Sequence, residues 1–97
     1  MKSRRTIELA ATDVEKIIND LSLLVVSMDR IGSSYPDKPR KHALEMDKFL
    51  LEVKAFKVLA KARGILTEAY DAQSSEAEVA RAEEEAESLP YWQYKKL

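Results

Sequence analysis

The chain has 97 residues, of which 45% are hydrophobic and 34% are charged, and its formal net charge is −1. A chain of this length forms one domain or one subunit of an assembly, and its core is modest in size. The glycine content of two residues is low, as in long helices, and the absence of cysteine excludes disulfide frameworks and thiolate metal sites.

A heptad pattern predicts a first helix over about residues 6–31. Apolar residues recur at every seventh position in three adjacent rows, as in a helix that packs along another helix. Thr6 is a suitable N-cap, and Gly32 a suitable C-terminal cap. If residues 7–11 form a short strand, the helix instead starts at Thr12, which makes a capping box with Glu15. The three rows are Ile7, Val14, Leu21 and Met28; Ala10, Ile17, Leu24 and Ile31; and Ala11, Ile18 and Val25.

Two large apolar residues of this helix lie outside the three rows. Leu23 and Val26 are about one turn apart and fall well round the helix from the heptad stripe. An amphipathic helix with a single neighbour has no need for apolar residues there. The pair therefore predicts a second contact, made with a partner.

A loop over residues 32–37 and a second helix over about residues 38–72 follow. Asp37 is a candidate N-cap, and Pro39 is tolerated in a first helical turn. Apolar rows cover most of this helix, so we expect neighbours on more than one side, and the short loop favours antiparallel packing on the first helix. Gly64 is interpreted as a tolerated glycine near a bend; a kink or a close approach of another backbone is the alternative. One apolar row consists of Leu44, Leu51, Val58, Ile65 and Ala72.

An acidic third helix is expected over about residues 75–88, where Ser75 and Glu78 form a capping box. Its apolar side is narrow, so it either docks on the second helix or frays. An aromatic and basic tail, residues 90–97, begins at Pro90. Aromatic rings at a chain end are candidate anchors for a partner, and the alternative is that they cover an end of the helical bundle. The rings belong to Tyr91, Trp92 and Tyr94.

Charge is unevenly distributed along the chain. Residues 1–63 carry thirteen Lys or Arg against nine Asp or Glu, whereas residues 64–94 carry one Arg against eight acidic residues. Two basic clusters are candidates for contact with an anion or nucleic acid, because free amides at a helix start favour anions. They lie at opposite ends of the first helix, so they do not form one patch within a subunit. The clusters are Lys2, Arg4 and Arg5 at the N-terminus, and Lys38, Arg40, Lys41 and His42 at the start of the second helix.

No pattern of catalytic or metal-binding residues is present in the sequence. There is no phosphate-binding loop, nucleotide-binding glycine pattern or metal-ligand spacing. His42, the single histidine, has no recognisable nucleophile or orienting group to work with. The carboxylates are explained as solvated helix faces. We therefore expect no enzymatic activity, no catalytic residue, no cofactor and no metal.

These observations predict an all-α fold, a long antiparallel helical hairpin with a short third helix. Its exposed apolar surface predicts assembly into a dimeric four-helix-type bundle. The expected function is that of a small non-enzymatic oligomer, a protein-binding adaptor, inhibitor or regulator. The expected partners are a second copy and another protein, and the alternative is binding of nucleic acid, a nucleotide or another phosphorylated ligand. The longest apolar run, residues 21–28, falls short of the roughly 20 residues that span a membrane, so we expect no membrane contact and a cytoplasmic location.

Overall fold

The computed structural model describes residues 5–94, in which all regular structure is helical. The expected all-helical class is confirmed, since helices make up 76% of the structure and no strand occurs in the described range. The positions of Lys2, Arg4 and residues 95–97 lie outside the described residues. The helices are α1 (Ala11–Ser34), α2 (Pro39–Glu52), α3 (Ala55–Ala72) and α4 (Glu76–Glu87).

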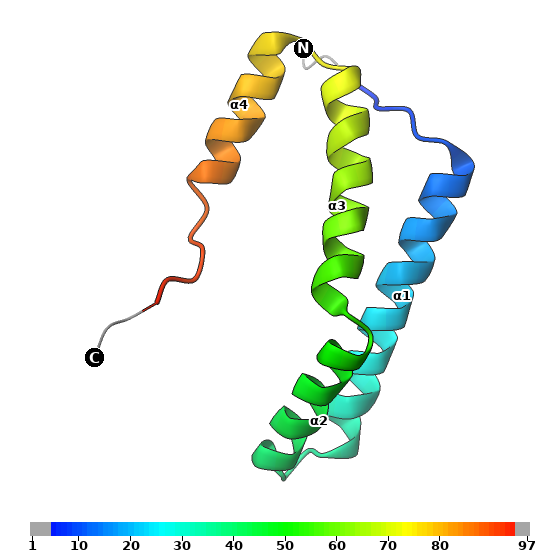
Figure 1. Cartoon of the computed structure of the whole chain (residues 1–97), viewed down its shortest axis with the longest axis vertical. Coiled ribbons are helices and arrows are strands. Elements are labelled where there is room, and N and C mark those ends of the chain that lie inside the picture. The colour runs from blue at the N-terminus through cyan, green and yellow to red at the C-terminus, as the bar shows by residue number, and fades with distance from the viewer. Residues whose placement is uncertain (1–4, 95–97) are drawn as a thin grey trace.

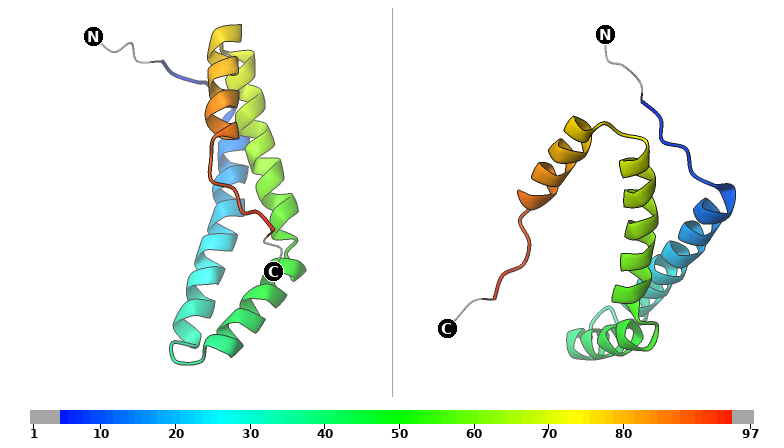
Figure 2. Two further views of the ribbon diagram at one scale, coloured as in Figure 1. Left: turned by 90° about the vertical axis from the view of Figure 1, so that its left-hand side faces the viewer. Right: turned by 45° about the horizontal axis from the view of Figure 1, so that its top comes forward.

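The helices are arranged as an open structure (Figure 1). α1 runs down one side, and α2 and α3 return along it and contact it. α4 then turns back at the top and stands apart from α3, as the two further views also show (Figure 2). The Cα radius of gyration is 17.7 Å, whereas a compact domain of this length has about 12.5 Å.

α1 begins later than the expected start near Thr6. Its N-cap is Ala10, which offers no side-chain cap, and Thr12 lies inside the helix. The preceding segment is extended because the side chain of Gln73 binds its backbone. The Glu8 N–H donates to Gln73 Oε1 at 2.8 Å, and Gln73 Nε2 donates to the Glu8 carbonyl at 2.7 Å. This pairing satisfies the backbone groups that a first helical turn would otherwise use.

The end of α1 also differs from the expectation. The helix continues through Gly32 to Ser34, and no glycine in the described range has a positive φ, so Gly32 is not a left-handed cap. The helix ends before Pro36 because a proline disfavours the helical conformation of the residue that precedes it. That residue, Tyr35, has φ −131°. The loop between the helices is therefore 35–38.

The start of α2 agrees with the expectation in one respect only. Pro39 occupies its first turn, as expected. The N-cap is Lys38 and not Asp37, and it makes no side-chain capping hydrogen bond. The first amides of α2 therefore lack a capping side chain.

The helix expected over 38–72 is interrupted at Val53 and Lys54, and this is the main correction to the predicted fold. Lys54 has φ 56° and ψ 52°, in the left-handed region. A non-glycine residue there costs about 1–2 kcal/mol. The break redirects the chain, so that Ala55 and Ala62 of α3 are buried, at 7% and 5% exposure. No glycine or proline marks this position, so the sequence gives no signal for it.

Gly64 lies in an unbroken stretch of α3, so it is not the site of the kink. A Cβ atom built at Gly64 meets no other atom within 4 Å. No backbone of the same chain approaches it closely. The interpretation as a tolerated glycine agrees with this geometry, but the bend expected near Gly64 does not occur within α3.

The hydrophobic core is small. Among the described residues, the buried apolar side chains are Ile17 and Leu24 of α1 and Ala55 and Ala62 of α3. Only one of the three predicted heptad rows of α1 thus contributes to the core. The accessible surface is 8781 Å² for a chain of 11.0 kDa, roughly 3,000 Å² more than the 5,600 Å² or so expected of a folded monomer of that mass. Part of this excess belongs to the extended segments on either side of the helices.

Candidate protein-binding groove

α4 starts with the predicted capping box. The Ser75 N–H donates to Glu78 Oε1 at 2.8 Å, and the Glu78 N–H donates to Ser75 Oγ at 3.2 Å. Two amides that a helix start leaves without partners are thereby satisfied. α4 is therefore anchored at its first turn by contacts local to its own sequence.

Arg5 ties the first turn of α4 to α3 and to the N-terminal segment. Its Nε lies 2.9 Å from Glu78 Oε2, and its Nη2 donates to the Gln73 carbonyl at 3.1 Å and to Ser74 Oγ at 2.9 Å. The guanidinium carbon lies 5.5 Å from the ring centroid of Tyr70, within the range of a cation–π contact. An exposed ion pair alone contributes little, but the combined contacts fix where α4 leaves α3.

The environment of Glu78 favours its charged form. The hydrogen bond from the Ser75 backbone is the largest cause that lowers the pKa of Glu78. The Ser75 hydroxyl and the positive charges of Arg5 and Arg81 lower it further, while partial burial opposes them. The carboxylate is therefore held ionised at the point where α4 begins.

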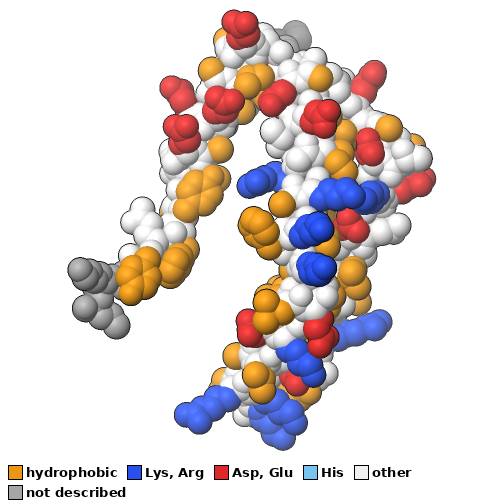
Figure 3. Space-filling view, viewed as in Figure 1, with side chains coloured by type: hydrophobic (Ala, Val, Ile, Leu, Met, Phe, Trp, Pro, Cys, Tyr) orange, Lys and Arg blue, Asp and Glu red, His pale blue; other side chains and the backbone are white. Residues whose placement is uncertain are grey.

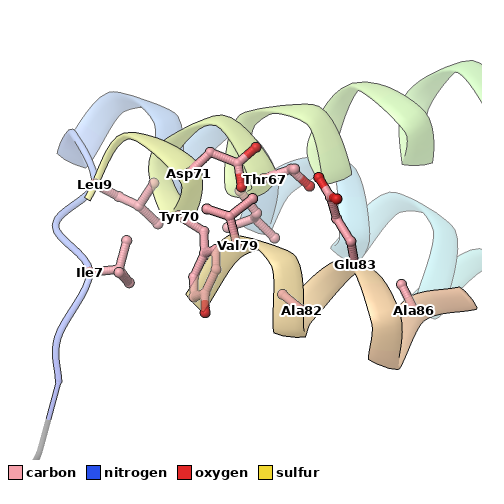
Figure 4. Close-up of a pocket in the computed structure, with 10 residues that line it drawn as sticks. Ile7, Leu9, Thr67, Tyr70, Asp71, Val79, Ala82, Glu83 and Ala86 are labelled. Carbon is pink, nitrogen blue, oxygen red and sulfur yellow. The ribbon is translucent and has the colours of Figure 1, made fainter. Parts of the chain in front are cut away.

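A groove of about 480 Å³ lies between α3, α4 and the N-terminal segment (Figure 4). Tyr70 of α3 and Val79 of α4 point into it, and Ile7 closes one end. The charged residues among those that line the groove are the carboxylates Asp71 and Glu83, and the lining contains no cationic side chain. The groove thus has apolar walls and an acidic rim. The full lining is Ile7, Leu9, Leu66, Thr67, Tyr70, Asp71, Val79, Ala82, Glu83 and Ala86.

The groove opens away from the base of α4. In the space-filling view, acidic side chains gather on the α4 arm, Lys and Arg lie over α3, and the arm and α3 separate below (Figure 3). No residue of α4 is buried. α4 is a complete helix that is fixed at its base and lacks close packing along its length, so the expected docking on α3 does not occur. That α4 frays stays a prediction.

The aromatic tail extends from the free end of α4. Tyr91 donates a hydrogen bond through its hydroxyl to the Ala86 carbonyl, so its ring folds back on the last turn. Trp92 and Tyr94 are 84% and 81% exposed. Trp92 and Tyr94 thus remain exposed to solvent at the free end of α4.

Arg5, the described member of the N-terminal basic cluster, lies far from the second predicted cluster. Lys38, Arg40, Lys41 and His42 lie around the first turn of α2, at the lower end of the molecule in Figure 1, whereas Arg5 contacts the opposite end. Lys41 Nζ lies 5.3 Å from the ring centroid of Tyr35. The structure therefore does not bring Arg5 to the second cluster, and Arg5 instead forms an ion pair with Glu78.

The second predicted contact on α1 is exposed and distant from the groove lining. Leu23 and Val26 are 49% and 46% exposed. By helical geometry Leu23 lies about 100–120° and Val26 about 160–180° round α1 from Ile17 and Leu24, so both are outside the buried side. Whether a partner covers them stays a prediction.

A further basic cluster joins α1 and α3. A side-chain hydrogen bond with Lys16, and then the repulsion of its positive charge, lower the pKa of Lys61. Desolvation and Lys57 act in the same direction, and Asp20 opposes them. The sequence did not reveal this cluster, because Lys16 and Lys61 meet only through packing of the two helices.

The described residues contain no group of His, Asp and Glu side chains that is arranged to hold a metal ion. None of the helices described is both long and apolar enough to cross a membrane. No family model matches the chain, and no curated protein and no solved structure matches it.

Proposed function

We propose that the protein is a non-enzymatic helical oligomer that acts as an adaptor, inhibitor or regulator by binding another protein. The groove between α3 and α4 is the observation that carries this proposal. Its walls are mostly apolar, its volume of about 480 Å³ admits side chains of a partner, and the exposed tail aromatics follow from the free end of α4. Apolar surfaces of this kind are rarely left uncovered on soluble proteins.

The chemistry of the groove favours one class of partner. Asp71 and Glu83 form the acidic rim, and α4 carries further carboxylates outside it. A helix that places apolar residues in a groove with such a rim is complemented by cationic flanking residues. We therefore propose a partner protein that presents an amphipathic helix with Lys or Arg beside its apolar stripe.

Trp92 provides a direct readout, since it is the single tryptophan of the chain and is 84% exposed. The probes are two synthetic amphipathic helical peptides with the same leucine pattern, one with lysine and one with glutamate at the polar positions. The lysine peptide should bind saturably, with a blue shift of the Trp92 emission, and the glutamate peptide should not bind. Equal binding of the two peptides would contradict the proposed partner class.

A matched pair of variants on α4 locates the binding. Ala82 lines the groove, whereas Ala80 lies on the exposed outer side of the same helix. Ala82→Glu should weaken lysine-peptide binding about tenfold or more, because it places a charge in the apolar wall. Ala80→Glu adds the same charge and should leave binding unchanged. If both variants bind as well as the parent protein, the groove is not the binding site.

The alternative, binding of nucleic acid or a phosphorylated ligand, would rest on the start of α2. Its first turn has no side-chain cap, and Lys38, Arg40 and Lys41 are exposed there. Free amides and cations at a helix start are suited to an anion. A salt-sensitive gel shift of short duplex DNA that is lost in Lys38→Ala/Arg40→Ala/Lys41→Ala would support it. No shift at low salt would exclude it as a DNA-binding site.

A further inference from the structure

An uncovered row of apolar residues runs along α1. It consists of Val14, Ile18, Leu21, Val25 and Met28, whose spacing alternates between four and three residues. All five side chains are exposed, from 36% at Val14 to 64% at Val25. This alternation is the seam of a coiled coil, in which each residue packs against a second helix. Within the chain, α3 packs instead against the neighbouring row of Ile17 and Leu24.

α3 has a row with the same spacing. It consists of Phe56, Leu59, Arg63, Leu66 and Tyr70. Phe56 is 85% exposed, and Leu59 and Leu66 are nearly half exposed. α4 flanks only the upper part of this row, where Leu66 and Tyr70 line the groove. The lower part is open.

The two rows lie on the same side of the molecule. At 3.6 residues per turn, each row is rotated by about 70° from the buried residues of its helix, in the same sense along the chain. α1 and α3 run in opposite directions and face each other through those buried residues (Figure 1). Equal rotations on two such helices point to one common side. The α1 row and the open lower part of the α3 row (Phe56, Leu59 and Arg63) form one surface, which we call the heptad face.

We propose that the heptad face binds the heptad face of a second copy, so that α1 and α3 of two chains form a four-helix core. This proposal specifies the oligomer on which part of the proposed function rests. A two-fold pair of this kind buries the same patch on both subunits. The exposed area in excess of a folded monomer, roughly 3,000 Å², is several times the 800 Å² or so that each partner buries in a standard interface.

The residue types of the face fit a second copy. On α1, β-branched Ile18 and Val25 alternate with Leu21, a pattern typical of the seam between packed helices. Arg63 is the single charged residue of the face, and it makes no ion pair within residues 5–94. Glu15 and Asp29 flank the α1 row and are likewise without such a partner there. The face thus carries both a cation and the acidic groups that complement it, as self-association requires.

Two adjacent leucines of α1 provide a matched test. Leu21 belongs to the heptad face and is 41% exposed, whereas Leu23 lies on another side of the helix and is 49% exposed. We expect the parent protein and Leu23→Glu to have twice the chain mass of 11.0 kDa in light scattering. Leu21→Glu should be monomeric, because two unpaired charges enter the interface. Its dimer dissociation constant should be at least about 100-fold higher than that of the parent protein. A monomeric parent protein at tens of micromolar would overturn the proposal.

Cross-linking gives a second test that does not depend on a destabilising charge. The chain has no cysteine, so a short bismaleimide reacts only with an introduced thiol. Leu21→Cys should yield a cross-linked dimer and Leu23→Cys should not. The reverse result would place the interface on the side of Leu23 and overturn the proposal.

The outcomes separate this interface from the groove. Leu21→Glu should still bind the lysine peptide with the Trp92 shift, since Leu21 does not line the groove. Ala82→Glu should lose the peptide and remain a dimer. In the parent protein, peptide binding without a dimer would retain the groove and refute the heptad-face dimer, and a dimer without peptide binding would do the opposite.

Discussion

The pair of helices α1 and α3 and the arm formed by α4 are stabilised in different ways. α1 and α3 contact each other and contain all the buried apolar residues of the described chain. α4 has no buried residue and is fixed through its first turn by the capping box and by Arg5. The first region is held by burial of apolar surface and the second by polar contacts at one end.

This difference explains how a short acidic helix is present without a core of its own. An isolated helix of 12 residues is marginal in water, and carboxylates towards the C-terminal end of α4 interact unfavourably with the helix dipole. A capped and tethered first turn removes much of the cost of starting the helix. The position of the arm is thus defined while its apolar side stays open to the groove.

The strongest test of the contrast is the removal of a buried side chain. Leu24 is 4% exposed, and Leu24→Ala should lower the free energy of unfolding by about 2–5 kcal/mol, through lost burial and the cavity it leaves. Leu23→Ala on the exposed side should change it by about 0.5 kcal/mol or less. Urea unfolding followed by circular dichroism measures both. Equal effects would show that the described core does not dominate stability.

Ser75→Ala should affect the arm alone. Loss of an N-cap costs about 1 kcal/mol, so amide hydrogen exchange in α4 should accelerate about fivefold. Exchange of the buried stretches of α1 and α3 should stay unchanged, which serves as the internal control. A global decrease in protection would mean that α4 is part of the cooperative core.

Gly64→Ala should increase the free energy of unfolding by about 0.5–1 kcal/mol, because alanine is the better helix former. The added Cβ meets no atom within 4 Å in the single chain. The midpoint of thermal unfolding checks this expectation. A decrease would show that a partner backbone lies close to Gly64 in the assembly.

The smallest expected effect on stability comes from the ionisation of Glu78. The pKa of Glu78 is lowered in the folded chain. The contacts of the Glu78 carboxylate therefore stabilise the fold fully at a pH above the ordinary Glu pKa of about 4.3. This stabilisation is lost as the pH falls through the lowered pKa. Carboxyl NMR titration should give Glu78 a pKa below the ordinary Glu value. Arg5→Ala should raise it part of the way towards that reference. An unchanged pKa in Arg5→Ala would show that the ion pair is not formed in solution.

Local sequence patterns were sufficient for several elements. Ser75 and Glu78 predicted the cap of α4, and Pro39 predicted the first turn of α2, because both signals depend only on neighbouring residues. The heptad pattern predicted that α1 is a helix and which of its sides are apolar. It did not predict which row would be buried, because three adjacent rows offer several equivalent ways to pack.

The break at Lys54 could not be predicted. The row of Leu44, Leu51, Val58 and Ile65 continues across it in the sequence, so the pattern indicates one straight helix. In the structure Leu44 and Leu51 are 66% and 72% exposed, whereas Val58 and Ile65 are partly buried. A left-handed residue is accepted there because the direction of α3 depends on how its alanines pack on α1, which is a property of the tertiary structure.

The candidate groove depends on the same kind of long-range contact. Arg5 and Gln73 are 68 positions apart, and no local pattern connects them. The sequence by itself determined the helical class, the cap of α4 and an excess of apolar surface over what one chain buries. The tertiary structure alone decided where the second helix breaks, which rows remain open and where α4 departs from α3, because these follow from packing and hydrogen bonds between distant residues.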